Sequence, residues 1–151
     1  HPNLPYAYVI NEIGSTVSVY DYNLESGQLK QKQKISTLPN NFSGMNSTAD
    51  VHVSKDGKFL YGSNRGHDSI AIFRIDQNTG ILDHIDNQTT MGHTPRNFSI
   101  TPDESMILVG NQDSDDIFSF RRDHTSGLLE FTGNRLEIPA PVCIQFMEKN
   151  N

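Results

Sequence analysis

Apolar and polar residues alternate along several short stretches of this chain. The alternation is clear in Val17 and Val19, in Ile70 and Ile72, and in Phe118 and Phe120. A period of two is typical of a strand with one buried face, whereas a helix repeats its apolar residues every three or four positions. Because no segment carries a sustained helical stripe, the pattern predicts an all-β protein.

Two landmarks recur along the chain in one register. Asn stands at positions 11, 64 and 111, and Gly stands at positions 27, 80 and 127, so both sets are separated by 53 and then 47 residues. Coincidence is a poor explanation for two landmarks that keep the same spacing. A period of about 50 residues is typical of propellers and solenoids.

Each repeat unit contains four predicted strands. In the second unit they cover residues 49–54, 58–63, 69–74 and 82–87, and the turns between them contain Asp56 and Gly80. Sheets of four antiparallel strands repeated at this spacing are the blades of a β-propeller. The predicted blades cover roughly 1–48, 49–95 and 96–139, and a closing strand is predicted at 141–146 in a single partial domain.

About three blades do not close a ring, because propellers have at least about four. We therefore expect either a portion of a longer protein or a partial ring that associates with copies of itself. The net charge of -6, without a cluster of Lys and Arg, argues against a nucleic-acid partner. No apolar run reaches the roughly 18 residues of a membrane span, so no membrane partner is predicted either.

The cysteine content says little about chemistry. Cys143 is the single cysteine, and the chain contains neither a CxxC nor an HExxH motif that would indicate a metal site. We therefore predict no metal and no cofactor. A reducing compartment fits a lone cysteine, so the predicted location is the cytoplasm.

The repeat phrases themselves are familiar. The runs "HPNLPYAYVINEIGSTVSVY", "ADVHVSKDGKFLYGSNRGHDSIAIF" and "HTPRNFSITPDESMILVGNQDSDDIFSF" resemble the lactonase family of seven-bladed β-propellers, and the likeness extends from His1 to Phe146. That family includes propeller-type 6-phosphogluconolactonases and fungal carboxy-muconate cyclases. The resemblance implies that these residues are the C-terminal three blades of a longer propeller and that the ligand is a small lactone or anionic sugar.

Functional side chains are expected where strand ends meet at one face of the blades. The first two strands of a blade are antiparallel, so Glu12, Arg65 and Arg96, near such ends, are expected around one mouth. Lactone hydrolysis needs a base for water and a positive group for the carbonyl oxygen. The resemblance matches Glu12 in "INE" and Arg65 in "SNR" to acting residues. Two structural alternatives stay open: a Glu12–Arg65 bridge between blades, and Arg96 bonded to backbone carbonyls.

Four further residues complete the predicted substrate-binding set. Asn64 immediately precedes Arg65, His67 follows it, and His93 precedes the "TPR" phrase, so all three are expected near the mouth. His52 lies in an inner strand and is expected to face the central channel. Each His also has a purely structural alternative: His52 can be a core residue, and the other two can be exposed loop residues.

Three functions compete at this stage. The first is a metal-independent lactone hydrolase that acts on a sugar lactone, most simply 6-phosphogluconolactone. The second is a non-catalytic propeller that binds a ligand or a protein, since one fold carries many functions. The third is a cycloisomerase related to the muconate cyclases, because an Arg fork suits phosphate and carboxylate alike.

Overall fold

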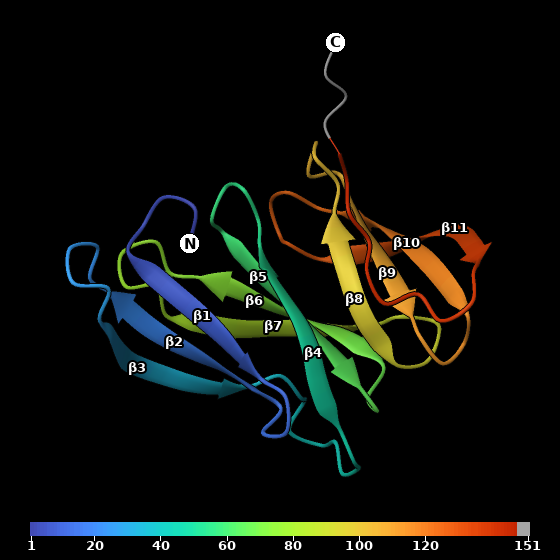
Figure 1. Cartoon of the computed structure of the whole chain (residues 1–151), viewed down its shortest axis with the longest axis horizontal. Helices are drawn as coiled ribbons and strands as arrows, with labels where there is room; N and C mark the ends of the chain where they lie inside the picture. The colour runs from blue at the N-terminus through green and yellow to red at the C-terminus, as the bar shows by residue number, and fades with distance from the viewer. Residues whose placement is uncertain (148–151) are drawn as a thin grey trace.

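The computed structural model describes residues 1–147, which form β-strands and no helix (Figure 1). The strands are β1 (Tyr6–Asn11), β2 (Thr16–Tyr22), β3 (Leu29–Ser36), β4 (Ser47–Val53), β5 (Phe59–Arg65), β6 (Ser69–Ile75), β7 (Leu82–Thr89), β8 (Pro95–Ile100), β9 (Met106–Asn111), β10 (Asp116–Arg122) and β11 (Leu129–Glu137). Over this range nothing helical is long and apolar enough to cross a membrane.

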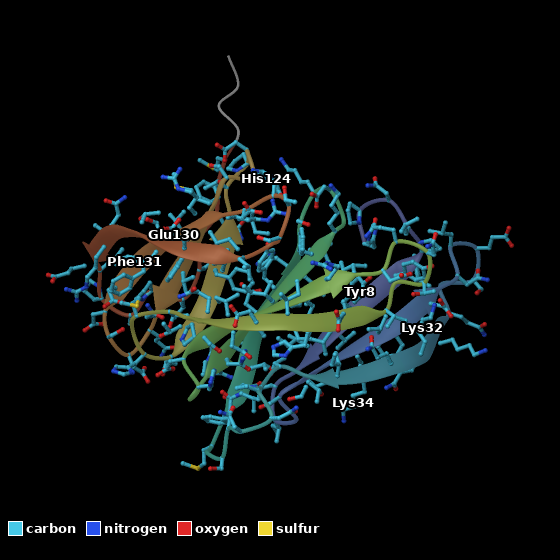
Figure 2. All side chains as sticks on the ribbon, turned by 180° about the vertical axis from the view of Figure 1, so that it is seen from behind. Tyr8, Lys32, Lys34, His124, Glu130 and Phe131 are labelled. Atoms are coloured by element: carbon cyan, nitrogen blue, oxygen red, sulfur yellow. The ribbon has the colours of Figure 1, made fainter. Side chains whose placement is uncertain are left out.

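The strands form three antiparallel sheets that lie side by side as a fan (Figure 1). The first sheet has the order β1-β2-β3, the second β4-β5-β6-β7 and the third β8-β9-β10-β11. Strand β4 contacts both β1 and β8. Figure 2 shows Lys32 and Lys34 on β3, and Glu130 and Phe131 on β11, at opposite ends of the fan. The prediction of an all-β partial propeller is confirmed.

The middle sheet supplies both hydrophobic cores. In β5, Phe59 and Tyr61 face the third sheet, and Leu60 between them faces the first. In β6, Ile72 faces the third sheet and Phe73 faces the first. Because successive strand residues point to opposite faces, one sheet can pack against a neighbour on each side. The predicted alternation of apolar residues therefore becomes a pair of contacts between adjacent blades.

Contact between blades depends on a glycine turn. Gly127, between β10 and β11, has a φ of +78°, and a Cβ added there would overlap the ring of Phe59 in the second sheet. Tyr61 donates its hydroxyl to the Gly127 carbonyl at 2.9 Å. The same bond joins Tyr8 to the carbonyl of Gly80 at 3.0 Å, between the first and second sheets. The recurring Gly thus marks the point where one blade rests on the preceding one.

A buried cation adds a second link between the second and third sheets. Arg122 is 2% exposed and donates from Nε to the hydroxyl of Tyr61 at 2.8 Å. Carboxylate oxygens of Asp56 and Glu104 lie 3.6 Å from its guanidinium. Burial raises the pKa of Tyr61 to about 12, so at neutral pH its hydroxyl keeps the proton that it donates to the turn.

The closing strand predicted at 141–146 is wrong for this structure. The segment contains no strand residue, although it runs beside β8. Ile144 donates its N–H to the side chain of Asn97 at 2.7 Å and accepts from the hydroxyl of Ser99 at 2.8 Å. These bonds join side chains to backbone. A strand needs a backbone ladder, and residues 1–147 form none with this segment.

Candidate functional site

The end of one strand and the start of its neighbour meet at one face of each blade. Ser47 at the start of β4 pairs with Arg65 at the end of β5. Pro95 at the start of β8 pairs with Asn111 at the end of β9 in the same way. Since the strands are antiparallel, the loops that precede β4 and β8 lie at the same edge as the loops that follow β5 and β9. We call this edge of the blades the mouth.

Arg65 and Glu12 form an ion pair at the mouth, between the second and first sheets. An Nη atom of Arg65 lies 2.5 Å from the Glu12 carboxylate and also donates to the carbonyl of Thr48 at 2.9 Å. The Arg65 side chain is 14% exposed, whereas that of Glu12 is 66% exposed. The buried Nε atom of Arg65 has no hydrogen-bond acceptor among residues 1–147. The pair thus presents a water-accessible carboxylate beside a cation that the protein holds in place.

A pocket of about 430 Å³ opens beside Arg65. Its lining residues come from three loops at the mouth and are Met45, Asn46, Ser47, Arg65, Gly66 and Thr94. Asn46 ties two of these loops together, because its side-chain oxygen accepts the N–H of His67 at 3.0 Å and its amide donates to Asn64 at 3.2 Å. Among the predicted residues, Arg65 lines the pocket directly and Glu12 adjoins it through the ion pair.

Arg96 occupies a β-bulge at the start of β8. Pro95 pairs with Asn111 and Asn97 pairs with Gly110, so Arg96 is the extra residue between them. A bulge turns a side chain away from the regular direction of its strand, and bulges are frequent next to active sites. Arg96 is exposed, and its side chain makes no hydrogen bond or ion pair with any residue in the range 1–147. Thr94, two residues earlier, lines the pocket, but Arg96 itself does not.

Asn64 and His52 do not line the pocket. Asn64 is fully buried, and its amide group is bonded to Thr37 and Ser69, so it supports the turn after β5 and offers no atom to a ligand. His52 lies in β4, where its Nε2 donates to Asp50 at 3.1 Å and its ring meets the Phe98 ring edge-on at 4.8 Å between centroids. The structure therefore gives these two residues packing partners within the protein.

His67 and His93 lie in the loops of the mouth. The Nδ1 atom of His67 is 2.7 Å from the Ser69 hydroxyl, and its ring meets the Phe42 ring edge-on at 4.8 Å. His93 is 77% exposed and donates from Nδ1 to Asp68 at 2.9 Å. That hydrogen bond and the charge of Asp68 raise the pKa of His93 above its ordinary value.

Two acidic residues that sequence reasoning missed organise this region. Burial would raise the pKa of Asp50, but hydrogen bonds from His52 and from the N–H groups of Phe98 and Val51 outweigh it, so the pKa lies below its ordinary value. Asp50 also accepts from Asn97 at 2.6 Å, which joins β4 to β8. Asp68 joins two mouth loops in a similar manner. The equivalent positions of the three blades, Ser15, Asp68 and Asp115, can be found from the sequence repeat, but the spacing does not reveal the bonds that these side chains make.

Within residues 1–147, no three His, Cys, Asp or Glu side chains gather in a group that could hold a metal ion. The mouth offers instead an exposed carboxylate, a fixed guanidinium and a second guanidinium on a bulge. Such a set can bind an anion and polarise a water molecule.

Comparison with known proteins gives a consistent family. The sequence profile described as "Lactonase, 7-bladed beta-propeller" matches residues 1–146. The 6-phosphogluconolactonase of Bacillus subtilis (strain 168) is 34% identical over 149 residues, which are 99% of this chain and 43% of that protein. A crystal structure of a protein from Lactobacillus plantarum superposes with a TM-score of 0.93 at 33% identity, covering 97% of this chain and 43% of the other.

A second solved structure has a name that bears on location. The periplasmic gluconolactonase PpgL of Pseudomonas aeruginosa superposes with a TM-score of 0.90 at 32% identity, covering 95% of this chain and 40% of that chain. The cytoplasmic location of this chain stays a prediction. This chain spans about two fifths of the length of the three relatives.

Proposed function

Because the chain belongs to the lactonase family of seven-bladed β-propellers, we propose that it contributes the Glu12–Arg65 side of a lactone-hydrolysing site. The observation that carries the proposal is the ion pair of an exposed carboxylate and a largely buried guanidinium beside a pocket of about 430 Å³. The name of the Bacillus subtilis relative makes 6-phosphogluconolactone the first substrate to test.

In the proposed reaction, the Glu12 carboxylate accepts a proton from water as the water oxygen attacks the lactone carbonyl carbon. The bond between that carbon and the ring oxygen then breaks, and the ring oxygen takes the proton from Glu12, which gives the open hydroxy acid and restores the Glu12 carboxylate. Arg65 keeps the carboxylate in place and supplies positive charge near the carbonyl oxygen as that atom becomes negative. Arg96, which is exposed and unpaired among the described residues, is proposed to bind the phosphate or another anionic end of the substrate.

The test is hydrolysis of 6-phosphogluconolactone, corrected for the spontaneous reaction. Glu12→Gln keeps the size of the side chain and removes its basicity, so we expect kcat to fall by about 10²–10⁴-fold. Glu25→Gln is the control, because Glu25 is an exposed residue in the β2–β3 turn and lies outside the proposed site. Equal activity of Glu12→Gln and Glu25→Gln would refute the role of Glu12.

Substrate class and assembly are tested on the same sample. Competition by gluconolactone, which lacks the phosphate, tests whether Arg96 selects for the anion: Arg96→Gln should reduce the preference for the phosphorylated lactone. Light scattering gives the mass of the species that carries the activity. Self-association of this chain stays a prediction. Turnover by a monomer would show that self-association is not required for activity.

A further inference from the structure

Asp68 lies in the turn that follows Arg65, and its carboxylate reaches the loop that precedes Arg96. Its Oδ1 atom accepts the N–H of Gly66 at 3.2 Å and the N–H of Thr94 at 2.9 Å. Gly66 directly follows Arg65, and Thr94 comes two residues before Arg96. One side chain therefore contacts both loops, and both of the residues whose N–H groups it binds line the pocket.

The loop before β8 has a backbone that needs such support. Met91 and Thr94 have φ angles of +64° and +59°, in the left-handed region that residues other than glycine seldom adopt. Strained residues of this kind persist where the surroundings hold them. Thr94 is held at its N–H by Asp68 and at its hydroxyl by Asp113, at 2.6 Å. The Thr94 carbonyl also accepts the N–H of Gln112 at 2.9 Å, so without the Asp68 side chain the strained residue would lose one of its two backbone hydrogen bonds.

The same turn position in the other blades supplies a comparison. Ser15, Asp68 and Asp115 are equivalent in the repeat and have φ angles of +46°, +50° and +56°. Ser15 accepts from the Asn46 side chain at 2.8 Å, and Asp115 accepts from the N–H of Ala140 at 2.8 Å. A bond from this turn to the next loop is thus a general feature of the fold, but of these three residues only Asp68 joins the turn after Arg65 to the loop before Arg96.

We propose that Asp68 is a positioning residue that holds the loop of Arg96 against the loop of Arg65 and so sets the width of the anion-binding mouth. The proposal rests on the proposed function, because it takes the two arginines as the groups that bind the substrate. It adds a residue that touches no substrate and acts through the loops that it joins.

His93 makes the link sensitive to pH. Its Nδ1 faces the second oxygen of Asp68, and Asp113 and Asp116 add negative charge nearby. The backbone N–H of His93 donates to the Ser114 hydroxyl at 2.8 Å. The raised pKa of His93 means that the charged pair is fully formed below the ordinary His value of about 6.5. The pair is lost as the pH rises through the higher value of the folded protein.

The experiment compares Asp68→Asn with Asp115→Asn, which removes the equivalent charge from a turn without either arginine. Binding of 6-phosphogluconate to the 151-residue chain is measured by calorimetry between about pH 5.5 and 8, a range in which His titrates. Asp68→Asn should weaken binding about tenfold, which corresponds to about 1.4 kcal/mol, and Asp115→Asn should leave it within about twofold. Equal weakening by the two substitutions would overturn the proposal.

A second measurement separates this proposal from the proposed function. Amide NMR signals of residues 91–94 and of Arg96 should shift in Asp68→Asn and stay in place in Asp115→Asn, with or without ligand. If the original chain fails to bind 6-phosphogluconate while these signals shift, the proposed function fails and the positioning role stands. If the signals do not shift, the positioning role is refuted. Should Asp68→Asn not fold, His93→Gln changes only an exposed partner of Asp68. Its binding of 6-phosphogluconate should vary less with pH than that of Asp115→Asn, which keeps the pair of His93 and Asp68.

Discussion

The contact of a glycine turn with the preceding blade can be tested by adding one methyl group. Gly127→Ala places a Cβ where the ring of Phe59 lies, and Phe59 is only 2% exposed. The left-handed backbone at this position costs about 1–2 kcal/mol for a residue other than glycine, and overpacking a buried ring costs about 1–3 kcal/mol more. We therefore expect a loss of about 2–5 kcal/mol in the free energy of unfolding.

Gly27→Ala is the matched control. Gly27 occupies the same turn of the first blade with a φ of +71°, but nothing lies within 4 Å of an added Cβ. It should lose only the backbone contribution, about 1–2 kcal/mol. Urea unfolding followed by far-UV circular dichroism measures both variants, since the chain has no tryptophan. Equal destabilisation of the two variants would refute the claim that the Gly127 turn supports the blade contact.

Two further changes test polar links between the inner parts of the blades. Tyr61→Phe leaves the Gly127 carbonyl and the buried Arg122 Nε without their shared partner, so we expect a loss of about 2–3 kcal/mol in the free energy of unfolding. Tyr8→Phe breaks one bond and should lose about 1 kcal/mol. Equal losses in urea unfolding would contradict this expectation. For Asp50, a lowered pKa means that the stability it contributes is present above its ordinary value of about 3.9 and is lost as the pH falls through the folded value. Asp50→Asn should therefore be less stable than the original chain by about 1–2 kcal/mol at neutral pH and match it in acid, and a difference that does not change with pH would argue against it.

Much of the fold follows from two repeated residues. Asn64 is the next-to-last residue of β5 and Asn111 is the last residue of β9, and Gly80 and Gly127 form the turns that contact the preceding blade. These positions recur because a buried amide and a positive φ admit few substitutes. The same register predicted the meeting of Arg65 with the start of β4, since antiparallel pairing of neighbouring strands fixes which ends meet.

The bonds at the site were less accessible to sequence reasoning. The sequence left two roles open for Glu12 and Arg65, a structural ion pair between blades and a part in catalysis, because a carboxylate next to an arginine can serve either role. Asp68 was missed since the partners through which it joins the two loops are backbone N–H groups, which leave no mark on residue spacing. The strand predicted at 141–146 failed because an alternating pattern indicates a potential strand, whereas a strand forms only beside a paired neighbour.

Burial on both faces of the middle sheet gives the two sides of the mouth different local stabilities. Every residue of β5 before Arg65 is buried, whereas the loop of residues 91–94 that precedes β8 is largely exposed or half-buried. Amide hydrogen exchange follows such differences, so β5 should open only with the whole domain and the 91–94 loop should open by local fluctuation. Arg65 then stands on a rigid strand, and the loop of residues 91–94 is the side of the proposed mouth that can move, so any change in the width of the mouth should come from that side alone.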